Sequence, residues 1–488
     1  MPMENVRGDT VSRLPMKLLS GRKYPFCDWR MVEPGYGMPF WDRYQRVHGT
    51  KPWLSPKGVA LRTYDLSPGS PVAGMEPTGQ VGAYCTLMKD GDKYRLWHET
   101  YGGEARGDLS AKICVIESSD CREFVRPELN LIEYEGRTAN NIVFGFGLPE
   151  TGGGFGGHGA TVMKDHSALA SERYKLVFLG LSPEGEDLLG WVYGAVSPDG
   201  YSWRMLPEPV ARALSDTQNV CARVENGYKL VLRGWNPMGL AGGGGRRSVR
   251  TCFSERFGGF PEPTEILCPP SSFGPMRDIY TSAWQMWPGA DIELMLPTLY
   301  DRDTDTTEVH VAVSRDGLQW DFPTSRPLYG GRHLPGTQTV YAGVGIVETA
   351  PMTWGIPLFI SDKAHNEYRL KTRQIHIATI REDGFTAIEA DLNGTFSLFP
   401  AAFECDSIKL NAVTRPGGSV TARLFTLDQD GGPVPVEGFD YRDFEPLTGN
   451  VDWSPLTWNG KKMPEPAGRP LRLEFDITRA RLHALKAE

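Results

Sequence analysis

A unit of several strand-like segments recurs about five times between Gly82 and Ala390, and this repeat restricts the fold more than any other feature. Each interval, 58 to 76 residues, is long enough for four strands and their connecting loops. A repeat of this length and strand content indicates a β-propeller, whose copies form blades around a central axis. Aligned on their opening strands, the units begin near Gly82, His158, Asp216, Asp278 and Tyr341.

The third strand of a unit often ends in a turn with the pattern Ser-x-Asp-Gly-x-x-Trp. The clearest copies span 197–203 and 314–320, and residues 118–124 form a degraded copy. Asp and Gly favour tight turns, because Asp bonds to nearby backbone and Gly adopts positive φ. Apolar and polar residues alternate between these turns, with many β-branched and aromatic side chains, which is typical of half-buried strands. The sequence therefore predicts five blades.

The sequence changes character near Gly394. Strand-like segments such as 407–413 and 471–477 alternate there with turn clusters, which predicts a second all-β unit of sandwich type. The predicted fold is all-β: a five-bladed β-propeller followed by a C-terminal β-sandwich. The predicted domains are an N-terminal segment over residues 1–75 that wraps the propeller, the propeller over 76–393, and the sandwich over 394–488.

Composition excludes several classes of partner. The net charge is −8 and no basic run occurs, so a nucleic-acid partner is not expected. No stretch has the ~20 apolar residues of a membrane span. The N-terminus lacks an apolar signal core, so we expect a cytoplasmic chain, or a secreted one whose leader is absent from this sequence. The eight cysteines form no C-x-x-C pair and are expected to be mostly buried free thiols.

Three acidic residues stand where the opening strands of a propeller should carry small or apolar side chains. Asp216 opens the third unit, Asp278 opens the fourth, and Glu348 ends the opening strand of the fifth. Opening strands meet around one pocket, so their carboxylates could lie roughly 5–9.5 Å apart, as paired-carboxylate glycoside hydrolysis requires. We therefore predict that Asp216, Asp278 and Glu348 are catalytic. For each residue alone, a turn or strand-edge role is the competing interpretation.

The chemistry suggests a role for each acid, although the roles could be exchanged. One carboxyl group must donate a proton to the leaving oxygen, and another must attack or activate water. We assign Glu348 as general acid and Asp216 as nucleophile or base, while Asp278 would hold sugar hydroxyls. Glu99 is a weaker candidate, because it lies at the far end of a second strand.

A further set of residues is predicted to bind the substrate. Arg233 could neutralise an acid, while Trp235, Tyr280 and Trp284 could stack on a sugar face. The competing interpretations are surface ion pairs, loop hydrogen bonds and packing between blades. The predicted binding residues are Glu76, His158, Asn219, Arg233, Trp235, Tyr280 and His365.

Over about residues 60–488 this organisation resembles the five-bladed propeller glycoside hydrolases of the invertase, levanase and arabinanase group. The likeness is greatest to glycoside hydrolase family 32, in which a β-sandwich follows the propeller. That family has an Arg-Asp-Pro motif whose Asp stabilises the transition state, and Arg277-Asp278-Ile resembles it without the proline. The family's Asn-Asp-Pro motif is absent, and the chain's only Glu-Cys pair, at 404–405, falls in the predicted sandwich. The resemblance implies a glycosidase acting on an oligosaccharide or glycoside.

Two alternatives remain open at this point. A phosphorylase or transglycosylase on the same scaffold would need a basic pocket, for which Arg233, Arg277 and His365 are candidates. A propeller that binds carbohydrate without cleaving it would tolerate loss of every central acid. No redox or organic cofactor is implied, and the only metal considered is a structural calcium ion in the central channel, for which no dedicated motif is present.

Overall fold

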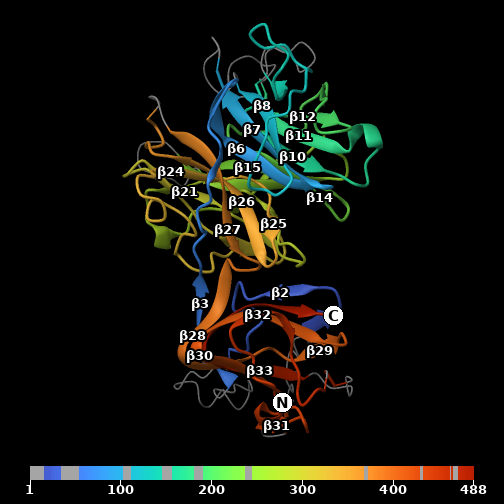
Figure 1. Ribbon diagram of the computed structural model, residues 1–488, viewed down its shortest axis with the longest axis vertical. Helices are drawn as coiled ribbons and strands as arrows, with labels where there is room; N and C mark the ends of the chain where they lie inside the picture. Colours follow the sequence, from blue (N-terminus) through green and yellow to red (C-terminus); the bar gives the residue numbers. More distant parts are fainter. Residues whose placement is uncertain are drawn as a thin grey trace, which may run out of the picture. The chain divides into compact units, whose positions relative to one another are not determined.

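The chain folds into two compact units in a computed structural model (Figure 1). The propeller unit comprises residues 65–288 and 292–382, and the second unit comprises residues 1–64, 289–291 and 383–488. No helix long and apolar enough to cross a membrane occurs among the described residues. The structure describes residues 16–34, 54–102, 111–145, 156–180, 191–236, 245–367, 372–428, 432–461, 463–464 and 471–488.

The first three blades of the propeller are single antiparallel sheets whose strands follow chain order. The first blade contains β5 (Met75–Glu76), β6 (Gly79–Asp90), β7 (Lys93–Tyr101), β8 (Lys112–Ser118) and β9 (Ile142–Gly145). The second contains β10 (Thr161–Lys164), β11 (Tyr174–Leu179), β12 (Val192–Ser197) and β13 (Arg204–Met205). The third contains β14 (Val220–Val224), β15 (Gly227–Asn236), β16 (Arg246–Ser254) and β17 (Thr264–Leu267).

The fourth blade is split into two short sheets, and the fifth closes the ring. One short sheet contains β18 (Arg277–Thr281), β21 (Thr298–Asp301) and β22 (Thr306–Val309). The other contains β19 (Gln285–Met286), β20 (Glu293–Met295) and β23 (Ala312–Ser314). The fifth blade contains β24 (Thr339–Ala342), β25 (Val347–Ala350), β26 (Thr353–Ser361) and β27 (Arg373–Arg381). Its outermost strand is β4 (Pro71–Ala73), which precedes the first blade in the chain, so the two ends of the propeller segment pair within one sheet.

Contacts between opening strands join the blades into a closed ring. Thr86 of β6 accepts a hydrogen bond from Val162 N of β10 at 3.1 Å, and it forms a parallel bridge with Val344 of the fifth blade. Gln218, just ahead of β14, donates to Ala342 O of β24 at 3.1 Å. These contacts link the first blade to the second and the fifth, and the third to the fifth. Thr307 of the fourth blade donates to Val340 O of β24 at 2.7 Å, and the predicted five-bladed propeller is confirmed.

The recurrent Ser-x-Asp-Gly turn has the same structure in its two clearest copies. At the end of β12, Ser197 Oγ accepts hydrogen bonds from the backbone of Asp199 and Gly200, and the Asp199 carboxylate accepts two more from the residues that follow. At the end of β23, Ser314 and Asp316 make the corresponding bonds. The motif is therefore a local, self-contained turn that ends the third strand of a blade.

The second unit is a β-sandwich made from one folded antiparallel sheet and a small parallel pair. Its three long strands are interrupted by register shifts, and residues on both sides of a shift enter the same core, so the sheet folds over on itself. The long strands are β28 (Thr386–Ser397), β30 (Ile408–Leu427) and β33 (Arg472–Ala487). The shorter strands are β1 (Met16–Leu19), β2 (Lys23–Pro25), β3 (Ala60–Thr63), β29 (Ala401–Glu404), β31 (Pro433–Pro435) and β32 (Asn450–Pro455).

The N-terminal segment differs from the expectation that residues 1–75 wrap the propeller. Strands β1, β2 and β3 pair with β29, β33 and β28 of the second unit, whereas β4 pairs with the fifth blade. Burial of apolar side chains explains this pairing, because Leu18, Phe26 and Val32 lie in the hydrophobic core of the second unit. That unit also begins at Asp383, ahead of the predicted boundary at 394. Residues 1–15 and 35–53 lie outside the described part of the chain.

The eight cysteines all lie in the described part of the chain, and none forms a disulfide. Six of them are buried, as expected, and Cys268 and Cys405 are partly exposed. Burial raises the pKa of the Cys114 thiol to about 11 and that of Cys121 to about 12, so both stay protonated at neutral pH.

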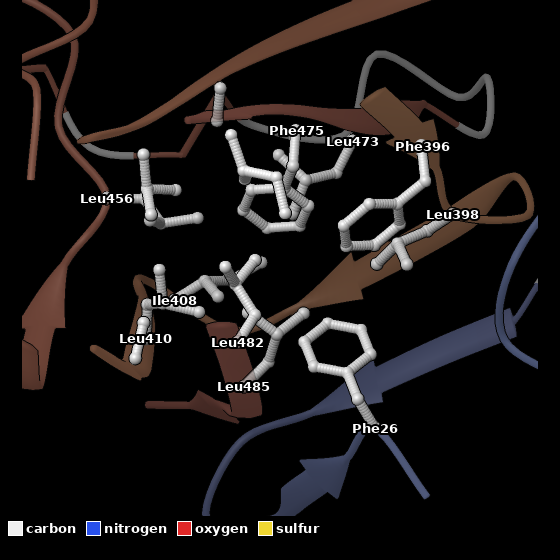
Figure 2. Close-up of a cluster of buried hydrophobic side chains, with 14 of the residues drawn as sticks. Phe26, Phe396, Leu398, Ile408, Leu410, Leu456, Leu473, Phe475, Leu482 and Leu485 are labelled. Atoms are coloured by element: carbon white, nitrogen blue, oxygen red, sulfur yellow. The ribbon is translucent and has the colours of Figure 1, made fainter. Parts of the chain in front are cut away.

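Three phenylalanines form the centre of the sandwich core (Figure 2). The Phe475 ring lies 5.3 Å from Phe396 and 6.5 Å from Phe26, centroid to centroid. We expect Phe475→Ala to lower the free energy of unfolding by about 3–5 kcal/mol, because it leaves a cavity among these rings. Urea unfolding followed by circular dichroism measures this. Leu392→Ala is the control, since Leu392 is 73% exposed, and equal effects of the two changes would contradict the packing described.

Candidate active site in the propeller

A cavity of about 440 Å³ is lined by residues from all five blades, and its volume suits a small molecule or a sugar unit. Among its described lining residues, Asp216 is the sole carboxylate. The other polar lining side chains are those of Tyr84, Tyr101, His158, Arg247, Tyr280, Thr339, Tyr341, Ser361, His365, Asn366 and Arg373.

Asp216 lies on the loop that leads into β14 and is held by one cation. Arg233 of β15 donates from Nη1 to Asp216 Oδ1 at 2.6 Å, and the Arg233 side chain is 1% exposed. The same guanidinium lies 4.4 Å from the centre of the Tyr280 ring. Among the described residues, none donates to Asp216 Oδ2. One oxygen is thus fixed by a charge-assisted bond, and the other is available to a ligand.

Asp278 lies behind the cavity wall and not in its lining. Its carboxylate is 1% exposed and accepts hydrogen bonds from Arg247 Nη1 at 2.8 Å and from Arg302 Nε at 2.8 Å and Nη2 at 3.0 Å. The Arg247 backbone N–H donates to it as well, at 3.1 Å. This geometry differs from the predicted contact with sugar hydroxyls, because both oxygens are already engaged. Asp278 instead positions two guanidiniums.

Glu348 and Glu76 do not line the cavity either. Glu348 is exposed on β25, where it pairs with Trp354 of β26. Glu76 is buried on β5, and Arg126 Nη2 donates to it at 2.9 Å. Burial acts to raise the pKa of the Glu76 carboxyl, but the Arg126 hydrogen bond and the neighbouring charges outweigh it and lower that pKa. Asp216, Asp278 and Glu348 therefore do not share one cavity in the structure.

The position of Glu348 follows from a break in the opening strand of the fifth blade. The sequence pattern predicts one strand through this region, but β24 ends at Ala342 and β25 begins at Val347. Gly345 has a φ of 115°, and a Cβ atom there would lie 1.9 Å from Leu87 O of the first blade. The chain thus crosses close to the first blade before Glu348, in a conformation that only glycine adopts readily.

A buried glutamate connects two cavity residues that come from different blades. Glu99 of β7 is fully buried, and it accepts from Tyr101 Oη at 2.9 Å and from Gly159 N at 2.6 Å. Tyr101 Oη lies 2.6 Å from His158 Nδ1, and His158 Nε2 lies 3.2 Å from Asp216 O. The predicted binding residue His158 thus lines the cavity as one member of a Glu99–Tyr101–His158 network.

Tyr101 Oη connects the buried Glu99 carboxylate to the His158 ring, at 2.9 Å from Glu99 Oε2 and 2.6 Å from His158 Nδ1. A phenol hydroxyl is both a donor and an acceptor, so it can pass a proton along such a chain of groups. A hydroxyl that lines the cavity can also donate its proton to a bound molecule.

The opposite part of the lining holds a second tyrosine–histidine pair. Tyr341 Oη lies 2.5 Å from His365 Nδ1, and the His365 ring centre lies 4.6 Å from that of Tyr280. Burial raises the pKa of the Tyr341 hydroxyl well above its usual range, so it remains a hydrogen-bond donor at neutral pH. His365 and Tyr280, both predicted to bind substrate, therefore lie in the cavity lining.

The remaining predicted binding residues lie outside this lining. Asn219 is buried, and its Nδ2 donates to Thr217 O at 2.9 Å, so it fixes the loop that carries Asp216. Trp235 is 41% exposed and lines an adjoining cavity of about 310 Å³. We call this second space the arginine cavity; it is lined by Trp235, Gly245, Arg247, Tyr300, Arg302, His365 and Asn366.

Arg247 and Tyr101 are the most informative site residues that sequence reasoning missed. Arg247 stands at the start of β16, directly after a glycine-rich stretch, and the basic pair at 246–247 beside these glycines could have been noticed. Tyr101 ends β7 two residues after Glu99, on the same face of the strand, so the two side chains meet.

Arg277 was a candidate for the basic pocket that a phosphorylase would need. In the structure it forms an ion pair with Asp301, at 3.0 Å, and it does not line the cavity.

The site as described offers no metal centre. No group of three or more His, Cys, Asp or Glu side chains is arranged to hold a metal ion within the residues that the structure describes. The described lining presents Asp216, the Glu99–Tyr101–His158 network, further tyrosine hydroxyls and arginines.

Comparisons with known proteins add similarity in structure only. No family model matches the sequence, and no curated protein matches it significantly. The structure is similar to a thermostable family-43 glycoside hydrolase, with a TM-score of 0.47, 12% identity, and coverage of 65% of this chain and 96% of that one. It is also similar to a family-43 arabinoxylan arabinofuranohydrolase from Bacillus subtilis, solved with cellotetraose, with a TM-score of 0.40, 10% identity, and coverage of 86% and 99%. An N-acetylgalactosamine deacetylase from F. plautii matches with a TM-score of 0.42, 13% identity, and coverage of 67% and 96%. Similarity at this level leaves the reaction to be argued from the residues of this chain.

Proposed function

We propose that the protein is a glycosidase that cleaves a glycosidic bond in the propeller cavity, with Asp216 as its essential carboxylate. The observation that carries this proposal is the state of Asp216: Oδ1 is fixed by the buried Arg233, and Oδ2 has no donor among the described residues. A positioned carboxylate with one free oxygen is what a nucleophile or general base requires. This keeps the role that the sequence suggested for Asp216.

The proton donor in this proposal is the Glu99–Tyr101–His158 network, in place of Glu348. Tyr101 Oη passes its proton to the leaving glycosidic oxygen and is reprotonated through its hydrogen bonds with His158 and Glu99. Asp216 attacks the anomeric carbon or removes a proton from the attacking water. Overall, water adds across the bond: its hydroxyl joins the anomeric carbon and its hydrogen joins the leaving group.

Two features favour a carbohydrate over a larger apolar ligand. The described lining is rich in hydroxyl, imidazole and guanidinium groups, which bond to sugar hydroxyls, and the rings of Tyr84, Tyr280 and Tyr341 offer faces for sugar C–H groups. A carbohydrate-binding propeller without catalysis would use the same groups, but it would not need a positioned Asp216.

The test is a panel of nitrophenyl glycosides and plant or algal oligosaccharides, assayed for released products with and without inorganic phosphate. Release of a free sugar without phosphate supports the proposal. Binding of an oligosaccharide by calorimetry, with no product from it under either condition, would assign the cavity to binding alone.

Tyr101→Phe tests the proton donor. We expect kcat to fall about 10²-fold, because the hydroxyl that donates the proton to the leaving oxygen is lost. KM should change less than kcat, because the lost hydroxyl acts mainly on the leaving oxygen. Tyr441→Phe is a matched control, because Tyr441 Oη also donates to a glutamate, Glu474 at 2.7 Å, but in the second unit. An unchanged kcat in Tyr101→Phe would reject the network as donor.

A further inference from the structure

The arginine cavity presents more positive than negative charge to solvent. Arg247 and Arg302 share a single carboxylate, that of Asp278. Both arginine side chains are about one-fifth exposed, 21% and 20%, whereas Asp278 is 1% exposed. The acid thus lies beneath the two guanidiniums, and one positive charge remains uncompensated at the surface of the cavity.

Donors on both arginines remain unused. Arg247 uses Nη1, and Arg302 uses Nε and Nη2, in their bonds to Asp278 and to Gly245 O. Arg247 Nη2 and Arg302 Nη1 have no acceptor among the described residues. Because Asp278 holds both groups, these donors are fixed in place before a ligand arrives.

Aromatic rings restrict Arg247 further. Its guanidinium carbon lies 4.9 Å from the Trp235 ring centre, 5.0 Å from Tyr280 and 5.7 Å from Tyr300. These contacts favour the charged group and keep its plane in one orientation. Two lining residues donate to the carboxylate of Asp305, Tyr300 from Oη at 2.8 Å and Asn366 from Nδ2 at 2.7 Å.

We propose that the arginine cavity binds an oxyanion, a carboxylate, sulfate or phosphate group, with Arg247 and Arg302 as its ligands. Fixed guanidinium donors match the paired oxygens of such groups. The cavity adjoins the Asp216 cavity, since the two share Arg247, His365 and Asn366. The anion is therefore either an acidic substituent of the carbohydrate or free phosphate that takes part in bond cleavage. This inference rests on the proposed function for the link to carbohydrate, but not for the anion site itself.

Direct binding to the full-length protein tests the site without any need for turnover. Isothermal titration calorimetry uses three probes at matched ionic strength: inorganic phosphate, D-glucuronate, and D-glucose as the neutral counterpart of glucuronate. We expect phosphate or glucuronate to bind more tightly than glucose, with an affinity that falls as NaCl is added. Glucuronate binding identifies an acidic sugar as the source, and phosphate binding with phosphate-dependent turnover identifies free phosphate.

Two variants assign the binding to the arginines. Arg302→Gln leaves Arg247 paired with Asp278 and removes the excess charge, so the anion should bind about 10- to 100-fold more weakly. Arg247→Lys keeps the charge but loses the planar fork, and a smaller loss of affinity is expected. Arg122→Gln, an exposed arginine on the first blade, is the control and should bind as the wild type does.

Two results would overturn the anion site: neither anion binds the wild type better than glucose, or Arg302→Gln and Arg247→Lys both bind the anion as the wild type does. These outcomes are separate from those of the proposed function. Anion binding without cleavage of any glycoside would reject the glycosidase and keep the site. Cleavage of neutral glycosides without anion binding would reject the site and keep the glycosidase.

Discussion

Asp216→Asn is expected to lower kcat by about 10²–10⁴-fold on any glycoside that the wild type cleaves. The amide keeps the shape of the side chain but cannot act as a nucleophile or a base. It also loses the charge-assisted bond with Arg233, which donates at 2.6 Å in the wild type. Arg233 is only 1% exposed, so loss of its counter-charge should also lower the free energy of unfolding, and the stability of the variant is measured beside its activity.

Steady-state kinetics and calorimetry on the same substrate separate loss of catalysis from loss of binding. Asp92→Asn, an exposed acid in the hairpin between β6 and β7, controls for the change in net charge. Asp216→Gly adds a chemical test, since added formate or azide should restore part of the activity if Asp216 is a nucleophile or base. Full turnover in Asp216→Asn would remove Asp216 from the reaction.

Asp278→Asn is expected to lower the free energy of unfolding by about 3–5 kcal/mol. The carboxylate is 1% exposed and balances Arg247 and Arg302, so the neutral amide leaves two guanidiniums without a counter-charge. An amide nitrogen would also face donors where the carboxylate oxygens now accept.

Urea unfolding followed by tryptophan fluorescence measures this effect, with calorimetry as a second probe because the chain has two units. Asp303→Asn is the matched control: Asp303 is exposed in the hairpin between β21 and β22, and its replacement should change stability by no more than about 0.5 kcal/mol. Similar stability of the two variants would contradict the role of Asp278 as the shared partner of the arginines.

The blades could be predicted because their evidence is local. The turn that starts at Ser197 closes on itself through hydrogen bonds within four residues, so its sequence pattern is enough to identify it. The same holds for the turn at Ser314. Alternation of apolar and polar residues likewise needs only the strand itself. Repeating these local patterns gave the number of blades.

The catalytic assignment was harder because it depends on where distant strands point. Asp216, His158, Tyr280 and His365 were selected from sequence and do line one cavity. Asp278 was selected on the same grounds, yet its carboxylate is taken up by Arg247, 31 residues earlier in the chain. Its role therefore depends on a partner that no local pattern connects to it.

The N-terminal segment shows the same limit. Leu18 and Phe26 are apolar in either arrangement, and their sequence does not say which core they enter. Pairing of β1 with β29 and of β2 with β33 joins residues that are nearly 400 or more positions apart. Such contacts have no periodicity to reveal them.

By itself, the sequence determined the all-β class, the repeated blade and the turns that end its third strands, since short-range hydrogen bonding and side-chain alternation specify these. Only the tertiary structure decided that Asp216 meets Arg233 and the Glu99–Tyr101–His158 network, and that Glu348 lies away from them. The physical reason is that charge pairing and burial act between atoms that are close in space. Ring closure, and not distance along the chain, sets which side chains become neighbours.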